Sequence, residues 1–420
     1  MAKNDFEERL RLTKYSLLAT GIRMNKGNET ASCRFFYKFL YYFNTFWLHT
    51  DVLAEFNYIV GAILAGKDFI EISLAIPTTT ICLLATAKSI VLFLNMDIVI
   101  KLVDKLRSIH PDLNDDTNLH DNSIKGKEAE LNREDDTRSQ QPHMNIQRQI
   151  VIESTTLLKF IVLLQYYIFV VVAVSFPLMP VISMIDEYLK KGVIEYQYPY
   201  FTKYFFETSN ALIWPFVYLH HVWSTFIVAL SVFGSDTLYY AACIYIQMHF
   251  RILCHRFENS VSSSPEQTKW VLAKAIKRHQ ELMDLVNMAE TLYSKSSLFN
   301  IIISSVLICI SGFIIMMVRD VGVTIPFGMF LLMNLSQISL LCLFGDMLLK
   351  ASTDVSSAIF NSKWYDSDQT IKRMVYIILI RAQRPCKLTA CKFSDLNLTA
   401  FTTILSRSWS YFALLKTIYK

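Results

Sequence analysis

The sequence predicts an all-α membrane protein with seven transmembrane helices, a cytoplasmic N-terminus and an extracellular C-terminus. Three observations lead to this fold class. First, the 420 residues are 53% hydrophobic and 13% aromatic, with a mean hydropathy of +0.31, which exceeds what soluble globular chains usually carry. Second, apolar segments long enough to cross a bilayer recur along the chain. Third, the segments between them alternate between many and few basic residues.

The apolar segments give the expected membrane spans. A hydrocarbon core about 30 Å thick requires roughly 20 mostly apolar helical residues. The first segment is the least regular, because His49, Asp51 and Glu55 interrupt it. The predicted spans are Phe35–Ala65, Phe69–Met96, Leu157–Ile185, Phe205–Phe233, Ser297–Val318, Val323–Leu349 and Leu396–Tyr419.

The distribution of Lys and Arg predicts the orientation. Roughly 30 of them lie before the first span and in alternate connections after it, whereas the other connections and the C-terminus hold about 7. Connections rich in Lys and Arg face the cytoplasm. The predicted orientation is therefore the reverse of that of a G-protein-coupled receptor. The first residues also lack the continuous apolar core of a cleaved signal peptide, so we expect no cleavage there.

The expected domains follow from these spans. Residues 1–34 form a cytoplasmic N-terminal segment, and residues 35–350 hold the first six spans. Within the latter, residues 108–145 are dense in charge and poor in large apolar side chains, which predicts a flexible cytoplasmic loop. Residues 236–291 keep apolar side chains near helical spacing, which predicts cytoplasmic helical extensions that pack together rather than a calmodulin target. Residues 351–394 form a cytoplasmic anchor segment, and residues 395–420 form the seventh helix.

Motifs of other functional classes are missing from the sequence. It has no glycine-rich phosphate loop, no zinc-binding His-Glu-x-x-His and no nucleophile elbow, so we expect neither an enzyme nor a bound cofactor. Basic residues are scattered between spans rather than gathered, which argues against a nucleic-acid partner. His220 and His221 are the nearest approach to a metal pair. Because adjacent residues point about 100° apart on a helix, we expect a polar pair and no metal site.

The last predicted helix carries a stripe of small hydroxyl side chains. Thr399, Thr403, Ser406, Ser410 and Thr417 are spaced by three or four residues, or by multiples of that spacing, along one helical face. Such a stripe can line a water-filled pore. The same hydroxyls can also bond backbone carbonyls at helix contacts, and the spacing alone leaves both interpretations open.

The C-terminal part of the chain resembles the signature of insect odorant receptors. One departure is Cys391, where the family often has glycine. The resemblance rests on these residues: Trp364, Tyr365, the Arg-Ala-Gln-x-Pro run of 381–385, Leu388, Thr389, Ala390, Lys392, Phe393, Leu396, Leu398, Phe401, Ile404, Leu405, Ser410, Tyr411, Phe412, Leu414 and Leu415.

This resemblance implies a ligand-gated non-selective cation channel, in which the last helices of four subunits surround one pore. The matched Ser-Tyr-Phe motif places the gate at Leu414 and Ile418, with Thr417 and Ser410 also lining the pore. A ring of apolar side chains blocks ions by excluding water. Arg407 in such a pore would repel cations, so we expect it to face a neighbouring helix or subunit.

The resemblance also implies a pocket for an odorant or pheromone among the second to sixth spans, in their outer halves. Apolar and aromatic contacts would hold the volatile molecule there. The candidate ligand-binding residues are Pro77, Thr80, Ile81, Tyr167, Val170, Val174, Trp214, Tyr218, Phe313, Met316, Phe327 and Phe330.

The expected partners are a small volatile organic ligand, membrane lipid and the odorant receptor co-receptor, with which the chain would form a heterotetramer. Trp364, Tyr365 and Arg381 are the candidate subunit-interface residues. The implied location is the plasma membrane of sensory-neuron dendrites. The alternatives are a gustatory-type receptor channel of the same superfamily, a G-protein-coupled receptor with an external N-terminus, and a transporter with internal repeats.

Overall fold

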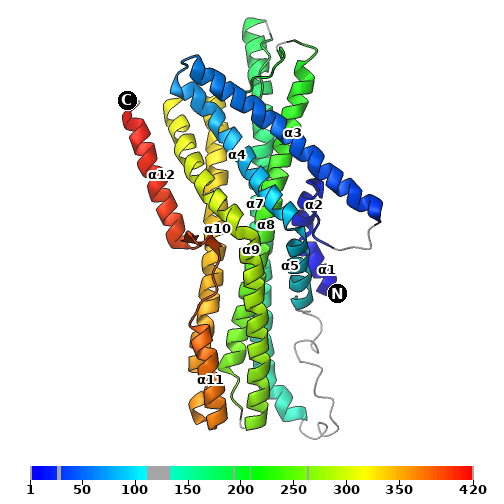
Figure 1. Cartoon of the computed structure of the whole chain (residues 1–420), viewed down its shortest axis with the longest axis vertical. Helices are drawn as coiled ribbons and strands as arrows, with labels where there is room; N and C mark the ends of the chain where they lie inside the picture. The colour runs from blue at the N-terminus through cyan, green and yellow to red at the C-terminus, as the bar shows by residue number, and fades with distance from the viewer. Residues whose placement is uncertain are drawn as a thin grey trace.

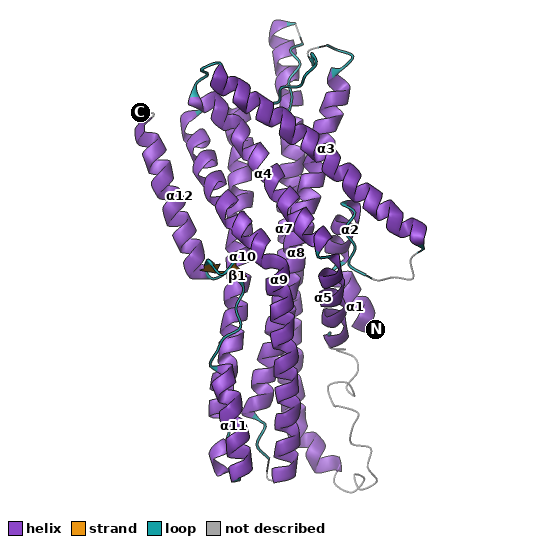
Figure 2. Cartoon of the chain, in the orientation of Figure 1, coloured by secondary structure: helices purple, strands orange, loops and turns teal. Residues whose placement is uncertain are grey.

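The computed structural model describes residues 2–25, 30–110, 133–192, 194–208, 210–262 and 264–418. The all-α prediction is confirmed, apart from one short two-stranded hairpin (Figure 2). The elements are α1 (Ala2–Arg9), α2 (Arg11–Ala19), α3 (Ala31–Leu64), α4 (Phe69–Leu94), α5 (Met96–Ile109), α7 (Arg133–Lys191), α8 (Trp214–Glu258), α9 (Pro265–Met317), α10 (Val321–Asn361), the 3₁₀ helix η1 (Trp364–Asp366), α11 (Gln369–Ala382), β1 (Thr389–Ala390), β2 (Ser394–Asp395) and α12 (Leu398–Ile418).

The long helices α7, α8, α9 and α10 run along the long axis of the molecule (Figure 1). α8 lies at the centre and packs against α2, α4, α7, α9 and α10. α3 and α4 cross this bundle obliquely, and α12 stands at one side of the molecule, against α9 and α10. The lower part of the molecule is a narrower stalk of helices that includes α11 (Figure 1).

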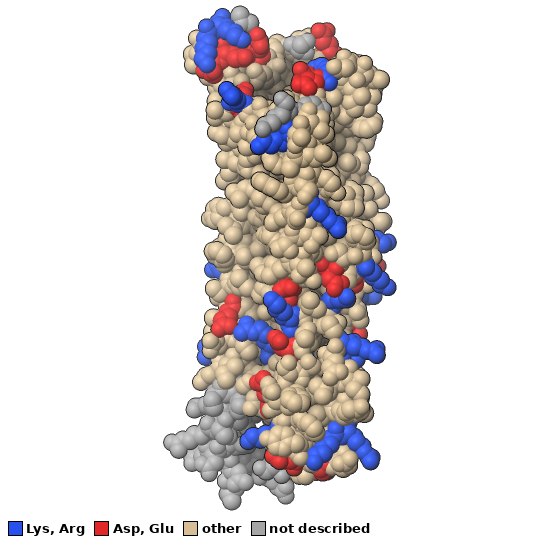
Figure 3. All heavy atoms as spheres, turned by 90° about the vertical axis from the view of Figure 1, so that its left-hand side faces the viewer, with Lys and Arg blue, Asp and Glu red and all other residues tan. Residues whose placement is uncertain are grey.

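Among the residues that the structure describes, five helices are long and apolar enough to cross a membrane. They are α4, α8, α9 and the segments 145–191 of α7 and 321–366 around α10. α3 carries the buried polar residues Asn44, Asp51 and Glu55, which lower its hydropathy. α12 has only 21 residues, and Arg407 lies near its middle. A broad band with few charged side chains separates charged zones on the face beside α12 (Figure 3).

The fourth predicted span begins too early. Residues 205–208 and 210–213 are not part of an α-helix, and α8 starts at Trp214, with Pro215 at one of its first two positions. Proline is favoured there because its missing N–H would have no helical partner. The indole N–H of Trp214 donates to the Gln197 carbonyl at 3.1 Å. Phe205, Phe206 and Leu212 are exposed, so these apolar side chains precede the helix without packing into the bundle.

The predicted helical extensions within 236–291 are present, since α8 continues to Glu258 and α9 begins at Pro265. The predicted flexible loop, 108–145, is wrong where the structure describes it. Residues 108 and 109 end α5, and residues 133–145 are helical as the start of α7. Residues 111–132 lie outside the described residues.

A buried ion pair links three helices at the centre of the bundle. The ammonium of Lys88 in α4 contacts one carboxylate oxygen of Asp236 in α8. The side-chain amide of Gln337 in α10 donates to the other oxygen at 2.6 Å. All three side chains are buried. A buried charge is tolerated when it is paired and hydrogen-bonded in this way.

The β1–β2 hairpin fixes the start of α12. The backbone N–H of Thr389 donates to the Glu290 carboxylate of α9 at 2.7 Å. Cys391 and Lys392, in the turn, have φ values of 50° and 58°. This left-handed conformation is cheapest for glycine, so glycine would fit the position of Cys391 with less strain.

The chain also passes very close to α10 at the start of α12. A Cβ atom added at Gly345 of α10 would lie 2.3 Å from the Leu396 carbonyl oxygen. Only glycine permits this approach, because no other residue lacks Cβ. The beginning of α12 is therefore held against α10 by backbone contact.

Candidate functional site

The described part of the bundle contains an apolar cavity between α4, α7, α8 and α10. Its apolar and aromatic lining suits contact with a small organic ligand. The residues that line it are Thr78, Ile81, Cys82, Phe169, Val172, Ala173, Phe176, Tyr200, Thr225, Val228, Ala229, Val232, Phe330 and Met333.

One face of α7 forms a wall of the cavity. Phe169, Val172, Ala173 and Phe176 follow the i, i+3, i+4, i+7 pattern of a single helical face. The ring of Phe176 packs edge-on against that of Phe330, with centroids 5.8 Å apart. Contacts between such rings favour a defined arrangement of the wall.

The polar side chains that line the cavity already form hydrogen bonds within the protein. The Thr225 hydroxyl donates to the His221 carbonyl at 2.8 Å, so its oxygen accepts from the Tyr200 hydroxyl. Thr78 donates to the Ala75 carbonyl at 2.9 Å. A ligand would consequently be held mainly by apolar contact, with the Tyr200 and Thr225 oxygens as the accessible polar partners.

Two of the candidate ligand-binding residues, Ile81 and Phe330, line this cavity. Phe327 lies beside it, because its ring is 6.4 Å from that of Phe176. Pro77 and Phe313 are buried outside the cavity wall, and Thr80 is half-buried. Of the candidate residues on α4 and α10, only Ile81 and Phe330 line the cavity, and Phe327 lies next to it.

The other candidates lie elsewhere. Tyr167, Val170 and Val174 are on the exposed face of α7, and Met316 is also exposed. Trp214 and Tyr218 are at the start of α8, where Tyr218 bonds the Pro177 carbonyl. Because α7 is apolar on every side, its sequence does not distinguish the face toward the cavity from the face toward lipid.

Tyr200 is a lining residue that sequence reasoning did not find. It belongs to the loop between α7 and α8, in a stretch without helical periodicity. No local pattern indicates that a loop residue reaches into the bundle. Its position follows from the way this loop folds back, since the Lys203 N–H donates to the Ala54 carbonyl of α3 at 2.9 Å.

α12 has a packed face and an exposed face. Ile404 and Ser408 are buried, and Phe412 lies beside Gly312 of α9. A crevice separates part of α12 from α9 and α10. The hydroxyl stripe and the candidate gate residues are exposed in the single chain, namely Thr399, Thr403, Ser406, Ser410, Leu414, Thr417 and Ile418.

The hydroxyls of this stripe also bond within the helix. Thr403 donates to the Thr399 carbonyl, Ser410 to the Ser406 carbonyl, and Thr417 to the Ala413 carbonyl, at 2.9–3.0 Å. Their oxygens remain exposed as acceptors. Arg407 is exposed as well, and it forms no ion pair with any residue that the structure describes.

The candidate interface residues lie in the stalk, around η1 and α11. Tyr365 and Arg381 are exposed, whereas Trp364 is partly buried against the core. α11 also exposes the apolar side chains Tyr376 and Ile377. Exposed apolar groups gathered on one helix are typical of surfaces that another chain covers.

Comparisons with known proteins identify a family for this chain. Residues 68–408 match the family model described as 7tm Odorant receptor. Putative odorant receptor 92a of Drosophila melanogaster is 24% identical over 88% of this chain and 84% of its own length. Odorant receptor 67c of the same species is 28% identical over 50% of this chain. The chain spans about half the length of several of these curated relatives, for example 53% of odorant receptor 67c.

The fold also matches solved structures of the insect olfactory receptor OR5 from Machilis hrabei. The complex with eugenol has a TM-score of 0.77 at 14% identity, covering 98% of this chain and 97% of that receptor. A second structure of this receptor gives a TM-score of 0.78 at 14% identity, with 99% of both chains covered. With a family model that matches most of the chain, a shared fold and several membrane-spanning helices, this multi-pass membrane protein belongs to the insect odorant receptor family.

Proposed function

We propose that this chain is the odorant-binding subunit of a ligand-gated non-selective cation channel. The observation that carries the proposal is the apolar cavity between α4, α7, α8 and α10 in a member of the odorant receptor family. Its walls suit a small volatile molecule with a large apolar surface and at most one or two polar groups. The related olfactory receptor was solved with eugenol, a molecule of this kind.

The proposed topology has seven spans, with the N-terminus in the cytoplasm. α3 and α12 are the spans that hydropathy alone does not support, and both lie against helices that it does support. The excess of Lys and Arg in alternate connections supports the orientation. In this orientation the stalk around α11 lies in the cytoplasm and the end of α12 lies outside.

The proposed pore is lined by the exposed face of α12 in four subunits. The stripe from Thr399 to Thr417 leaves hydroxyl oxygens unshielded in the single chain, which suits contact with water. Leu414 lies on the same face, one turn after Ser410, and is 59% exposed. A ring of such side chains would close the pore by dewetting.

α10 couples the cavity to α12 in this proposal. Phe330 and Met333 face the cavity, whereas Leu331 and Leu335 face the crevice beside α12. A ligand that binds more tightly when α10 is displaced would shift the equilibrium toward an open pore. Gly345, on the same helix, holds the start of α12, so a movement of α10 is transmitted to it.

A first prediction concerns the cavity. Ala173→Phe adds a phenyl ring to the cavity wall, so we expect at least a tenfold rise in the odorant concentration for half-maximal current, which corresponds to about 1.4 kcal/mol. Val174→Phe is the matched control, because Val174 is the next residue on α7 and is 46% exposed. Current recordings in oocytes measure both variants. An equal effect of the two substitutions would contradict this cavity as the binding site.

A second prediction concerns the gate. Leu414→Ala removes apolar volume from the narrow part of the proposed pore, so we expect current without odorant to rise several-fold. Leu398→Ala makes the same chemical change at the other end of α12 and should leave unstimulated current low. Recording both variants before any odorant is applied tests this. Unchanged basal conductance in Leu414→Ala would place the gate elsewhere.

The proposed partner is the odorant receptor co-receptor, in the dendrite membrane of a sensory neuron. The exposed apolar side chains Tyr376 and Ile377 of α11, next to Tyr365 and Arg381, support an intersubunit surface in the stalk. Trp364 would hold this surface in place, because its side chain packs against the hydrophobic core of its own chain.

A further inference from the structure

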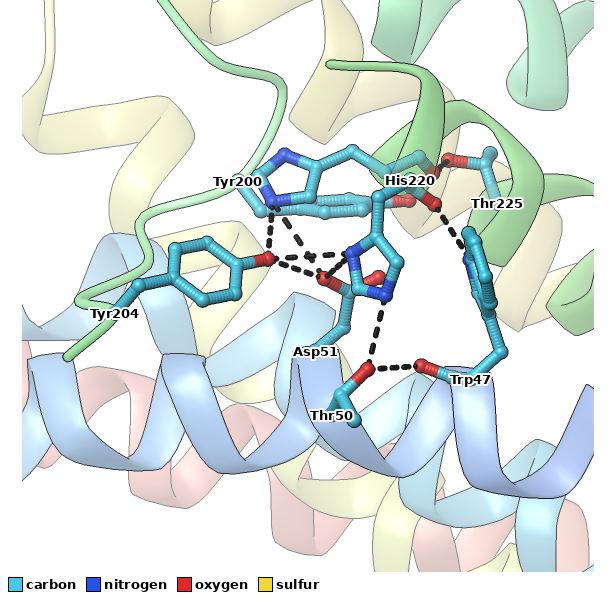
Figure 4. A network of polar contacts seen from close by, with 8 residues as sticks. Trp47, Thr50, Asp51, Tyr200, Tyr204, His220 and Thr225 are labelled. Atoms are coloured by element: carbon cyan, nitrogen blue, oxygen red, sulfur yellow. Dashed lines mark hydrogen bonds and ion pairs between the residues drawn. The ribbon is translucent and has the colours of Figure 1, made fainter. Parts of the chain in front are cut away.

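Four polar side chains converge inside the bundle, away from the proposed pore (Figure 4). Asp51 comes from α3, His220 and His221 from α8, and Tyr204 from the loop that precedes α8. Asp51 Oδ1 lies 2.8 Å from His220 Nδ1, 3.5 Å from His221 Nε2 and 2.7 Å from the Tyr204 hydroxyl. The Tyr204 hydroxyl lies 3.3 Å from His220 Nδ1 and 2.9 Å from His221 Nε2.

The sequence argued against such a cluster, because neighbouring residues point about 100° apart on a helix. The two histidines meet because they use different ring nitrogens. His220 presents its nearer nitrogen, Nδ1, and His221 presents its farther nitrogen, Nε2. The point at which they converge is supplied by Asp51, from a different helix.

With both histidines neutral, the hydrogen atoms available do not satisfy this cluster. Thr50 donates its hydroxyl hydrogen to the Trp47 carbonyl at 2.6 Å, so its oxygen accepts from His220 Nε2 at 2.9 Å. A neutral His220 then directs the lone pair of Nδ1 at Asp51 Oδ1. This contact requires a positive charge between the two atoms, either a proton on His220 or a bound cation.

The carboxylate of the cluster has only histidines as candidate counter-charges. Asp51 is 1% exposed and His221 is 0% exposed. Among the described residues, the only ion pairs of Asp51 are those with these two histidines, and no Lys or Arg pairs with it. Glu55, one turn further along α3, is buried as well. A buried carboxylate requires a cation, either as an ion pair or as a bound metal.

We propose that Asp51, His220 and His221 bind a divalent transition-metal cation of the zinc class. Two imidazole nitrogens and one carboxylate oxygen are a typical zinc donor set. Tetrahedral ligands at about 2.0–2.1 Å from zinc lie roughly 3.3 Å from each other. The two separations from Asp51 are 2.8 and 3.5 Å, and all three donor atoms lie within 4.8 Å of one another. The Tyr204 oxygen, or a water molecule in its place, completes the fourth position.

The surroundings support the proposed ligands. The bond from Thr50 to His220 Nε2 fixes the orientation of that ring, as outer partners of metal-binding histidines do. The ring centroids of Trp47 and His220 are 4.8 Å apart, and the indole N–H of Trp47 donates to the His220 carbonyl at 3.3 Å. His220 remains 16% exposed, which leaves a path for the ion. The bound metal would join α3, α8 and the loop that also carries the cavity residue Tyr200.

The test uses the purified full chain in detergent, equilibrated with ZnCl2 and freed of unbound ion, with zinc per chain measured by mass spectrometry. We expect one zinc ion per chain. Asp51→Asn and His221→Gln should each weaken zinc binding at least about tenfold. His49→Gln is the matched control, because His49 is on the same helix as Asp51, is exposed and bonds only the Thr45 carbonyl among described residues. It should bind zinc like the wild type.

Calcium provides a second control, because it prefers oxygen ligands to imidazole and should not bind here. Failure of the wild type to retain zinc would overturn the proposal, as would equal binding by wild type, Asp51→Asn and His221→Gln. If these variants do not stay monodisperse, Co²⁺ bound to the wild type decides. An absorption spectrum of tetrahedral Co²⁺ supports the site, and that of the octahedral aqua ion overturns it. None of these readouts depends on channel activity.

Discussion

Asp236→Asn is expected to destabilise the chain by about 3–5 kcal/mol, because it leaves the Lys88 ammonium buried without its counter-charge. The pair lies at the junction of α4, α8 and α10, where Gln337 also bonds Asp236. The loss should lower the unfolding temperature of the detergent-solubilised chain and reduce its delivery to the cell surface. Fluorescence of the detergent-solubilised chain measures the unfolding temperature, and surface labelling of intact cells measures delivery.

The double variant Lys88→Met, Asp236→Leu separates the pair from the packing around it. Replacing both charges by apolar side chains of similar size is often neutral or stabilising for a buried pair. We therefore expect the double variant to recover most of the stability that Asp236→Asn loses. If the double variant were as unstable as the single one, shape at this junction would matter more than charge.

Gly345→Ala is expected to separate the start of α12 from α10 and to abolish odorant-evoked current. The added Cβ would lie 2.3 Å from the Leu396 carbonyl oxygen. A backbone atom cannot turn aside as a side chain can, so the cost should reach or exceed the 1–3 kcal/mol that is typical of overpacking. Current recordings, together with surface labelling, distinguish loss of gating from loss of delivery.

Gly328→Ala is the matched control in the same helix. A Cβ at Gly328 would have no atom within 4 Å, and alanine favours a helix by about 1 kcal/mol over glycine. This variant should conduct like the wild type. Normal odorant responses in Gly345→Ala would show that α12 tolerates a shift at Leu396 and would refute its coupling to α10 at this point.

The sequence predicted helices better than it predicted their ends. Continuous apolar runs identified α4, α9 and α10, since burial in lipid or protein requires them. It placed the fourth span too early, because Phe205 and Phe206 resemble the start of a membrane segment and yet lie before α8, which starts at Trp214. Hydropathy counts apolar side chains, and it does not separate a short apolar stretch before a helix from the helix itself.

The site was less predictable than the fold, for a physical reason. Phe169 lines the cavity and Tyr167 is exposed, yet both are large aromatic residues of one apolar helix. Where lipid and protein core are equally apolar, polarity does not mark the inward face. Tyr200 and the Asp51 cluster depend on how a loop packs on α3, which no local periodicity encodes.

The last helix shows what residue spacing can give. The three- and four-residue spacing predicts that Thr403, Ser406 and Ser410 share a helical face, and all three are exposed on α12. Whether that face meets water or another subunit depends on assembly, which a single chain does not determine.

The most direct test of the account is current recording in oocytes that express this chain with and without the insect co-receptor, while a broad panel of volatiles is applied. We predict an odorant-evoked cation current that requires both chains and that Ala173→Phe weakens. Absence of current despite confirmed surface delivery of both chains, or a response that requires a G protein, would contradict the assignment of this chain as a channel subunit.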